Sequence, residues 1–464
     1  MPAAIETVLQ HADATLPAAR DALFDLLRIA SISARPEHAA DCRRAAEWVR
    51  DFLAATGFAA TVRPTAGHPI VVAHHPGPPG YTGPHVLFYG HYDVQPVDPL
   101  DLWTSPPFEP QLVEGPRGPR FVARGAVDDK GQVMMFLSAL RAWHDAGGGV
   151  PARVTVLLEG EEETGSPNLE PFLAANKTEL AADLALISDT GMWDVDTPAI
   201  TTRLRGLLYT EVKLRAARRD LHSGLFGGSA LNPINALCAA LGGLHDANGR
   251  IQLPGFYDAV KPVSAAQAAE WEQMGFDEGA FLGDIGLRIP VGERDRPALQ
   301  RLWARPTADI NGIWGGYTGP GSKTVIASEA FAKVSFRLVP DQDPQAVLES
   351  FRSFLAARVP ADAAVAVTVL GGAAPGIEIP ADSPFVRAAR EVLGEEYGRP
   401  ALLMGSGGSI PVVASLRRVL GIDSLLMGFG LDDDQVHSPN EKFEQRCFHH
   451  GIRSHVRLLG RFGG

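Results

Sequence analysis

Five clusters of acidic residues and histidines constrain this chain more than any other feature of its sequence. Most of them directly follow a short run of apolar residues, at the point where a buried strand would end. The clusters are His91-Tyr92-Asp93, Asp128-Asp129-Lys130-Gly131, Glu161-Glu162-Glu163, Ser188-Asp189-Thr190 and His437-Ser438-Pro439-Asn440-Glu441. Side chains of these kinds, brought to one end of a sheet, form a site for two metal ions. The pattern therefore favours a hydrolase over a binding module.

The apolar pattern before residue 207 predicts an α/β fold. Short runs of apolar and β-branched residues, typical of buried strands, alternate with segments in which apolar residues recur at helical spacing. The strand-like runs are 86–89, 154–158 and 184–187, and the helical segments are 16–56 and 131–146. Alternating strands and helices predict a mostly parallel sheet that is covered by helices on both faces.

A different pattern begins near residue 207 and indicates an inserted domain. Residues 207–214 alternate between apolar and polar, as in a half-buried antiparallel strand. Two more strands and two helices are expected in this region, and 249–322, rich in Gly, Pro and Trp, is interpreted as lid and loop with some helix. We predict a discontinuous catalytic domain at 1–206 and 380–464, with an inserted α+β lid and dimerisation domain at 207–379.

The composition excludes several classes of partner. A net charge of -12 at pH 7 disfavours binding to nucleic acid and to anionic membranes. The sequence has no apolar run long enough to cross a bilayer, and its first residues do not form a secretory signal. Cys42, Cys238 and Cys447 form no paired motif, which is typical of a reducing compartment. We therefore expect a cytoplasmic protein without nucleic-acid or membrane partners.

The first two clusters contain candidate metal ligands and candidate supports for them. His91 and Asp93 are two residues apart, so they lie on the same side of an extended segment. One can bind a metal while the other accepts the proton on the far ring nitrogen, although most isolated His-x-Asp motifs are surface or cap residues. Asp128 is the better ligand candidate of its pair, because it lies nearer the strand side of the loop, whereas Asp129 could instead cap the following helix.

The next two clusters suit metal chemistry as well. Glu162 and Glu163 follow a buried strand, and two adjacent glutamates fit two tasks, because one can bind a metal while its neighbour activates water. Surface runs of acids are usually solvated, but this run directly follows a strand of apolar and β-branched residues. Asp189 also ends a strand, where an aspartate is often only a turn residue.

The last cluster combines a ligand candidate with residues that have a structural explanation. Ser438 and Glu441, three residues apart, fit a capping box for a final helix that we predict at 441–459. His437 has no such explanation, because it stands outside the predicted helix and follows a run of three aspartates. His437 is therefore the residue of this cluster that lacks a structural explanation.

Taken together, these motifs resemble the binuclear zinc exopeptidase and amidohydrolase family, most strongly its branch of cytosolic non-specific dipeptidases and carnosinases. The resemblance covers nearly the whole chain, because the motifs from Gly90 to Glu441 appear in the family's order. It implies two divalent metal ions per subunit, Zn²⁺ foremost, with Mn²⁺ or Co²⁺ as alternatives. The implied ligands are His91 and Asp189 for one ion, Glu163 and His437 for the other, and Asp128 for both.

The resemblance also implies catalytic roles. Asp93 orients His91. Glu162 is the general base that takes a proton from a metal-bridging water and passes it to the leaving amine. Residues 220–224 resemble the segment of the family whose histidine stabilises the tetrahedral oxyanion, which assigns that role to His222. Because this histidine often reaches the active site of the partner subunit, the resemblance implies a homodimer formed through the inserted domain.

Four residues match substrate-binding segments of the same branch. They are Thr324, Arg337, Gly408 and Ser409. Arg337 would bind a substrate carboxylate through paired hydrogen bonds, whereas without the resemblance it would be interpreted as a strand arginine in an ordinary salt bridge. The sequence departs from the branch at Gly405 and Ser406, which stand where an Arg-Glu pair is usual. Losing both charges would open and neutralise one wall of the substrate pocket.

The resemblance implies a zinc-dependent hydrolase that cleaves the amide bond of dipeptides or short peptides. The neutral residues Gly405 and Ser406 leave an alternative open, an amidohydrolase or aminoacylase acting on N-acyl or N-carbamoyl amino acids or on another non-peptide amide. A catalytically silent scaffold is disfavoured, because every implied ligand and Glu162 are present.

Overall fold

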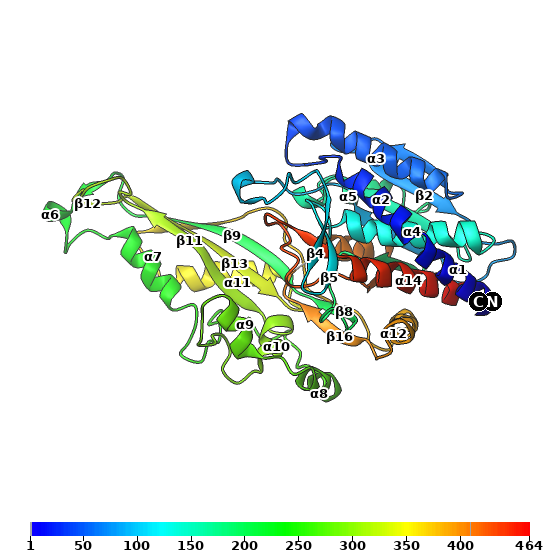
Figure 1. Ribbon diagram of the computed structural model, residues 1–464. Helices are drawn as coiled ribbons and strands as arrows, with labels where there is room; N and C mark the ends of the chain where they lie inside the picture. The colour runs from blue at the N-terminus through cyan, green and yellow to red at the C-terminus, as the bar shows by residue number, and fades with distance from the viewer. Residues whose placement is uncertain (1, 409) are drawn as a thin grey trace. The chain divides into compact units, whose positions relative to one another are not determined.

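The computed structural model describes residues 2–408 and 410–464 (Figure 1). The chain divides into two compact units. The first contains residues 1–202, 379–404 and 412–464, and the second contains 203–378 and 405–411. The lid and dimerisation roles of the inserted region, and the boundaries given above, stay predictions.

The first unit is built on a sheet whose central strands are parallel. In spatial order its strands are β1 (Ala59–Arg63), β2 (Ile70–His75), β6 (Val154–Glu159), β3 (Val86–His91), β7 (Leu184–Ile187), β17 (Ser424–Leu426) and β8 (Ala199–Leu204). Two further strands, β15 (Ile377–Glu378) and β16 (Leu402–Ser406), both pair with β8. Neighbours from β6 to β17 pair in parallel, whereas β1, β2 and β8 pair antiparallel. β6 and β3 are buried along their whole length, as expected for parallel strands covered on both faces. The predicted fold class is confirmed.

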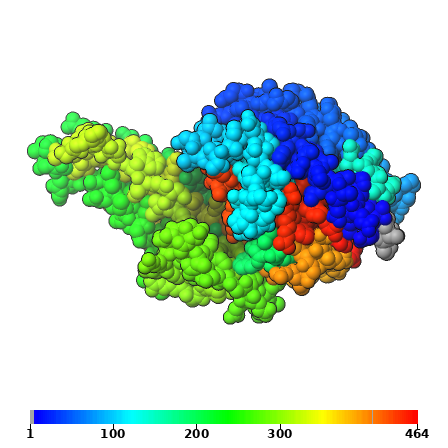
Figure 2. All heavy atoms as spheres, in the orientation of Figure 1, coloured from blue at the N-terminus to red at the C-terminus, as the bar shows by residue number. Residues whose placement is uncertain are grey.

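Helices from both ends of the chain cover this sheet. They are α1 (Pro2–Ala14), α2 (Leu16–Leu27), α3 (Ala39–Ala54), α4 (Lys130–Ala146), α5 (Leu169–Ala175), α12 (Pro384–Tyr397), α13 (Pro411–Ser415) and α14 (Gln445–Phe462). α4 packs against α1, α2 and α14, while α3 packs on β1 and β2 (Figure 1). Figure 2 shows the N-terminal segments in blue beside the C-terminal segment in red. Because α4 is enclosed by other helices, nearly all its side chains are buried.

A smaller antiparallel sheet lies beside the helices of the first unit. It contains β18 (Lys442–Glu444), β5 (Gly118–Val122) and β4 (Gln111–Gly115), in that order. β18 occupies residues that we predicted to be helical, so the final helix begins at Gln445 and not at Glu441. The backbone of residues 442–444 pairs with β5, which holds it in an extended conformation.

The second unit has its own antiparallel sheet and core. The order is β11 (Thr307–Gly315), β13 (Glu329–Leu338), β9 (Gly206–Arg215) and β14 (Ala364–Val369), and α7 (Pro233–Gly242) and α11 (Pro344–Ala356) pack on it. Side chains along β9 and β13 alternate between buried and partly exposed. This alternation is the pattern that predicted a half-buried antiparallel strand, and the apolar side chains form a core with α7 and α11.

One strand of this sheet was missed from the sequence. β11 lies within 249–322, which we interpreted as lid and loop material. It pairs with β13 along one side, and its register shifts between Ile310 and Gly312. Most of its side chains are at least partly exposed, so it carries no apolar alternation that could have revealed it. The interpretation was wrong for these residues because main-chain pairing, and not burial, makes them a strand.

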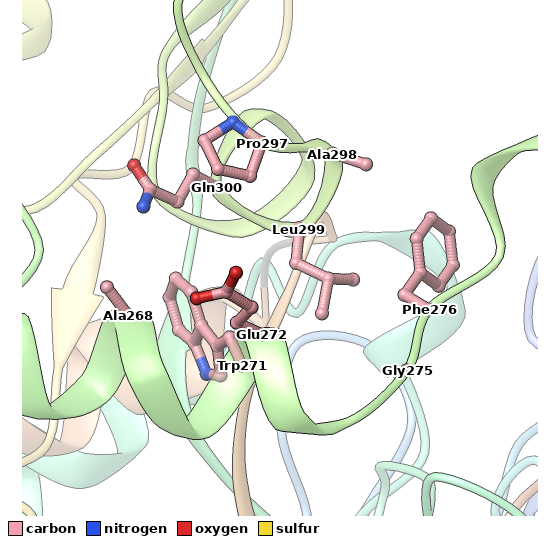
Figure 3. A pocket seen from close by; sticks show the side chains of 9 residues that line it. All are labelled: Ala268, Trp271, Glu272, Gly275, Phe276, Pro297, Ala298, Leu299 and Gln300. Atoms are coloured by element: carbon pink, nitrogen blue, oxygen red, sulfur yellow. The ribbon is translucent and has the colours of Figure 1, made fainter.

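The remainder of 249–322 contains short helices, as expected. α8 (Ala265–Gln273), α9 (Glu278–Asp284) and α10 (Ala298–Trp303) lie there. A cavity of about 310 Å³ lies between α8 and α10. Trp271 and Leu299 line it, and Phe276 lies at one side (Figure 3). Trp271 of α8 also contacts Trp303 of α10 edge to face, so these helices share apolar contacts. Among the helices that the structure describes, none is both long and apolar enough to cross a membrane.

Candidate metal centre

Strand ends and the loops that follow them supply the acid and histidine clusters of the first unit. His91 is the last residue of β3, and Asp189 follows β7 closely. Asp128 stands just before α4, and Glu163 lies in the short helix η3 (Glu162–Thr164) that follows β6. Since β6, β3 and β7 are parallel neighbours, their carboxyl ends meet at one edge of the sheet. His437 lies in the loop between β17 and β18.

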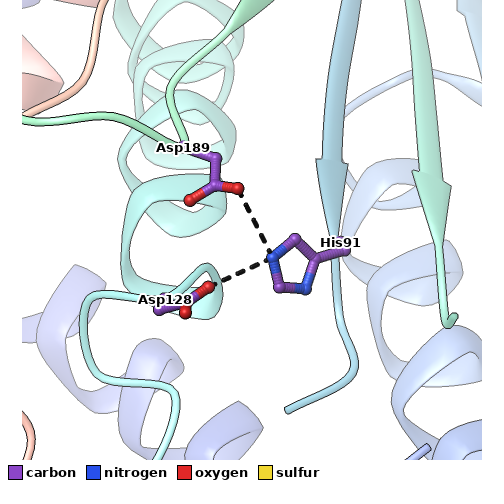
Figure 4. A group of neighbouring side chains, drawn as sticks. All are labelled: His91, Asp128 and Asp189. Atoms are coloured by element: carbon purple, nitrogen blue, oxygen red, sulfur yellow. Dashed lines mark ion pairs between the residues drawn. The ribbon is translucent and has the colours of Figure 1, made fainter. Parts of the chain in front are cut away.

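One histidine faces two carboxylates at this edge. Nε2 of His91 is 3.2 Å from Oδ1 of Asp128 and 3.7 Å from Oδ2 of Asp189 (Figure 4). Asp189 and Asp128 approach the ring from different loops, and His91 is fully buried. The three ligand atoms lie close enough together to hold a single metal ion.

A second group shares one residue with the first. Nε2 of His437 is 2.9 Å from Oδ2 of Asp128 and 3.2 Å from Oε2 of Glu163. Asp128 therefore directs one carboxylate oxygen toward each histidine. Although burial opposes its ionisation, the adjacent imidazoles of His437 and His91 lower the pKa of Asp128. The hydrogen bonds to Asp128 and Glu163 raise the pKa of His437 to about 10. Two ions close together need such a shared carboxylate, because it reduces their mutual repulsion.

The contacts of the His91 ring leave one of its two nitrogens available to bind a metal ion. Its Nδ1 lies 3.1 Å from the main-chain oxygen of Asp93 and 3.4 Å from that residue's Oδ1. A proton on Nδ1 satisfies these acceptors and leaves an electron pair on Nε2. Within the described part of the chain, buried Nε2 makes no hydrogen bond. A buried nitrogen without a hydrogen-bond partner, aimed at two carboxylates, fits a divalent cation.

Asp93 also positions the two adjacent glutamates. Its Oδ1 accepts a hydrogen bond from the backbone N–H of Glu162 at 3.3 Å, and its Oδ2 accepts one from Glu163 at 3.2 Å. Burial raises the pKa of Glu162 to about 8, and the nearby charges of Asp189 and Glu163 act in the same direction. A carboxylate that gains a proton this readily is suited to proton transfer near neutral pH.

The structure corrects two helix-cap interpretations. Asp129 stands at the N-cap position of α4, but its side chain makes no cap hydrogen bond. Its Oδ2 instead accepts a hydrogen bond from the backbone N–H of His91 at 3.0 Å. Ser438 and Glu441 form no capping box, because β18 separates them from α14. Asp129 and Glu441 instead accept hydrogen bonds from backbone N–H groups at or beside the proposed metal ligands His91 and Asp128. Local spacing in the sequence could not reveal contacts this distant.

Two further residues contact or adjoin the glutamates, and one of them, Gln95, was not singled out from the sequence. Nε2 of Gln95 donates a hydrogen bond to Oε2 of Glu163 at 2.8 Å. Glu161, which belongs to the third cluster, has a structural role, because its carboxylate accepts hydrogen bonds from the backbone of His68 and from Asn168. Only the position of Gln95, two residues beyond Asp93, could have suggested its contact.

The second unit contains the predicted oxyanion and substrate residues. His222 ends β10 (Leu221–His222), which pairs antiparallel with β12 (Val325–Ile326). The backbone N–H of Ser223 donates to the carbonyl oxygen of Thr324 at 3.1 Å, so His222 and Thr324 lie at the same end of this short ribbon. Nδ1 of His222 accepts a hydrogen bond from the backbone N–H of Gly224 at 3.0 Å, and the side chain is exposed.

Arg337 lies on β13, opposite Leu207 of β9 and Thr307 of β11. Sequence reasoning missed a second arginine near it. Burial lowers the pKa of Arg205 to about 10, and the charge of Arg337 contributes in the same direction. Nε of Arg205 donates to the carbonyl oxygen of Gly407 at 3.1 Å. Arg205 and Arg337 therefore lie close enough in the second unit for their charges to interact, and the charge of Asp309 acts on Arg205 in the opposite direction.

Gly405 and Ser406, which stand where the branch has an Arg-Glu pair, are the last two residues of strand β16 (Leu402–Ser406) and carry no charge. A Cβ atom added to Gly405 would lie 2.5 Å from Cβ of Trp303, so this position has no room for a side chain. Oγ of Ser406 accepts a hydrogen bond from the backbone N–H of Gly408 at 3.1 Å. The expectation of an opened wall at Gly405 is therefore wrong, because Trp303 fills the space. Ser409 lies outside the described residues.

Known proteins match the chain over most of its length. Residues 87–461 match the family described as Peptidase family M20/M25/M40. The Cys-Gly metallodipeptidase dug1 of Schizosaccharomyces pombe is 31% identical over 79% of this chain and 78% of that protein. The Beta-Ala-His dipeptidase of Homo sapiens is 30% identical over 79% of this chain and 73% of that protein. A solved M20 family metallo-carboxypeptidase from Sulfolobus solfataricus is 30% identical with a TM-score of 0.82, covering 96% of this chain and 99% of that one.

These matches confirm the predicted family and its dipeptidase and carnosinase branch. They do not favour the alternative of an amidohydrolase that acts on N-acyl or N-carbamoyl amino acids. The protein is a metal-dependent peptidase, and its clustered histidines and carboxylates fit divalent ions. The chain belongs to peptidase family M20/M25/M40.

Proposed function

We propose that this protein is a dipeptidase that holds two zinc ions in the first unit. The observation that carries the proposal is the position of Asp128, whose two oxygens each face a different histidine. His91 and Asp189 would complete one ion site, and Glu163 and His437 would complete the other. Imidazole nitrogens and carboxylate oxygens are ligands that zinc accepts, and manganese or cobalt suits the same set.

Glu162 is the proposed general base. The bound ions would polarise the scissile carbonyl and make a water molecule nucleophilic at neutral pH. Glu162 would accept the proton of that water and deliver it to the leaving amine, while Asp93 holds the Glu162 backbone and the His91 ring in place. In the neutral ring of His222, Nδ1 accepts a hydrogen bond, so Nε2 carries the proton. An N–H at Nε2 suits a donor to a tetrahedral oxyanion.

The proposed substrate is a small peptide with a free carboxylate. Arg337 would bind that carboxylate through paired hydrogen bonds, and Arg205 would add positive charge to the same region. Thr324, Gly408 and Ser409 are proposed as further contacts to the substrate. The Schizosaccharomyces pombe and human relatives are both named as dipeptidases, which supports a dipeptide substrate for this chain.

Chelation followed by metal restoration tests the proposed function. Exhaustive treatment with a chelator is expected to abolish dipeptide hydrolysis, because neither water activation nor carbonyl polarisation remains. Added zinc, manganese or cobalt should restore it. The measurement is the initial rate on a panel of dipeptides, N-acyl amino acids and N-carbamoyl amino acids. Activity that survives chelation, or turnover of the N-acyl compounds without any dipeptide turnover, would contradict the proposal.

We also infer that the protein is a cytoplasmic homodimer and that His222 acts in the site of the partner subunit. His222 stands at an exposed end of the second unit, and Leu225 nearby is 78% exposed. Such an end is suited to contact another subunit. Cys42, Cys238 and Cys447 are free thiols, which supports a reducing compartment.

Mixing two inactive variants tests action across subunits. Dimers that combine a His222→Ala subunit with a Glu162→Ala subunit would contain one site with both residues intact. A random mixture of the two should therefore recover roughly a quarter of wild-type activity, because about half its dimers are mixed and each has one complete site. The measurement is the dipeptide hydrolysis rate of mixtures whose subunit exchange has been verified by mass spectrometry. No recovery in verified mixed dimers would refute this model.

A further inference from the structure

We propose that Glu441 and Arg124 are positioning residues of the metal centre, because they fix the loop that presents Asp128. Neither residue belongs to the proposed ligand set. The inference rests on the proposed function only in taking Asp128 as a ligand shared by both ions. It assigns to Glu441 a role that the capping-box interpretation did not contain.

The carboxylate of Glu441 organises the backbone immediately before Asp128. Oε1 accepts hydrogen bonds from the backbone N–H groups of Val127 at 2.9 Å and Asp128 at 3.1 Å. Oε2 accepts one from the backbone N–H of Gly125 at 3.0 Å and one from Nη1 of Arg124 at 2.7 Å. Glu441 is fully buried, so water cannot replace these donors without opening the loop. Four donors on one carboxylate fix both the position and the direction of residues 125–128.

Arg124 is itself anchored on the side away from Glu441. Its side chain is 1% exposed, and its Nη2 donates to the carbonyl oxygen of Pro96 at 3.1 Å. Its backbone N–H donates to the carbonyl oxygen of Pro107 at 2.9 Å, and its guanidinium lies over the ring of Trp103 at 5.4 Å from the centroid. These contacts fix the position of the Arg124 guanidinium. It therefore cannot move with the Glu441 carboxylate if that carboxylate is displaced.

Glu441 also connects the Asp128 loop to the segment of His437. His437 precedes it by four residues, and both His437 and Asn440 have left-handed backbone conformations, with φ of 60° and 63°. Oδ1 of Asn440 accepts a hydrogen bond from the backbone N–H of Thr104 at 2.7 Å. This contact attaches the segment 437–441 to the loop that contains Thr104. Through Glu441, the two facing ligands Asp128 and His437 belong to one hydrogen-bonded assembly.

A change in this assembly should reach both ion sites. Asp128 faces His91 with one oxygen and His437 with the other, so a small rotation of its backbone disturbs both distances. Outer residues that orient metal ligands typically contribute 10–100-fold to metal affinity. A buried ion pair with a purely structural role would instead change the stability of the fold and leave the metal affinity of the folded protein unchanged.

The test compares Glu441→Gln with Glu396→Gln. In Glu441→Gln, the amide nitrogen replaces one acceptor oxygen and meets N–H donors, so the loop must shift. Glu396 is a matched control, because its carboxylate is 2% exposed and accepts hydrogen bonds from His450, Arg453 and Arg457. Zinc affinity is measured on the folded proteins by competition with a chromogenic chelator, and stability by thermal unfolding of the metal-free proteins. We expect at least about a tenfold loss of zinc affinity in Glu441→Gln and none in Glu396→Gln.

The outcomes separate positioning from a purely structural role. Wild-type zinc affinity in a folded but less stable Glu441→Gln protein would overturn the proposal. If that variant does not fold, Arg124→Lys decides, because lysine keeps the charge but cannot contact Glu441 and Pro96 together. A lower zinc affinity in Arg124→Lys supports the proposal, and an unchanged affinity overturns it. Because binding is measured without peptide, the result does not depend on whether dipeptides are the substrate.

Discussion

Replacing Glu162 with glutamine is expected to lower kcat for dipeptide hydrolysis by about 10²–10⁴-fold, the usual contribution of a positioned general base. Glutamine keeps the shape of the side chain but cannot accept the proton of the attacking water. Glu162 belongs to neither group of proposed ligands, so zinc content should stay near the wild-type level. The measurements are kcat under saturating peptide and metal content by elemental analysis of the purified variant.

Glu161→Gln is the matched control for this experiment. Glu161 is the neighbouring acid and is also largely buried, but its oxygens accept hydrogen bonds from the backbone of His68 and from Asn168. Its replacement should leave turnover close to that of the wild type. Undiminished turnover in Glu162→Gln would remove the base assignment. A fall in zinc content together with turnover would mean that Glu162 acts through the metal site instead.

Asp128→Ala should have the largest effect on metal content. Since the Asp128 carboxylate faces His91 and His437, its loss should weaken both ion sites. Removing a shared carboxylate also increases the repulsion between two ions at close distance. Activity should fall by more than about 10³-fold, because water activation and carbonyl polarisation together contribute several kcal/mol.

His91→Ala distinguishes a shared ligand from an ordinary one. His91 belongs to a single group, so its loss should weaken one site and leave the Glu163 and His437 site partly occupied. Zinc titration of both variants by calorimetry provides the comparison. Equal zinc stoichiometry in Asp128→Ala and the wild type would contradict a bridging role for Asp128.

The sequence predicted the parts of the site that depend on strand ends. His91 and Asp189 each follow an apolar run, and parallel pairing of β3 and β7 places those ends side by side. An apolar run of this kind is visible in the local sequence, because a strand that is buried on both faces of a parallel sheet consists mainly of apolar residues. The resemblance supplied the proposed roles of Glu162 and His222, because the spacing showed that one of two adjacent glutamates could activate water but not which one.

The supporting contacts could not be predicted, for a physical reason. Glu441 bonds the backbone of Asp128, which is 313 residues away in the sequence. A capping box explained Glu441 locally, and only pairing of β18 with β5 excludes that explanation. β11 was missed for a related reason, since main-chain pairing with β13 specifies it while its side chains remain largely exposed. Long-range pairing leaves little trace in local composition.

The interrupted course of the first unit has a consequence for how the chain is synthesised. β17 lies between β7 and β8, and α14 packs against α4, so the sheet and its cover need residues from 424 to 462. Most of the second unit is a continuous stretch, 203–378, whose core can form once that stretch has left the ribosome. His437 follows this whole stretch in the sequence, so the complete set of proposed ion ligands exists only after the continuous part of the second unit has been synthesised. Metal loading is therefore expected to come after the core of the second unit can form.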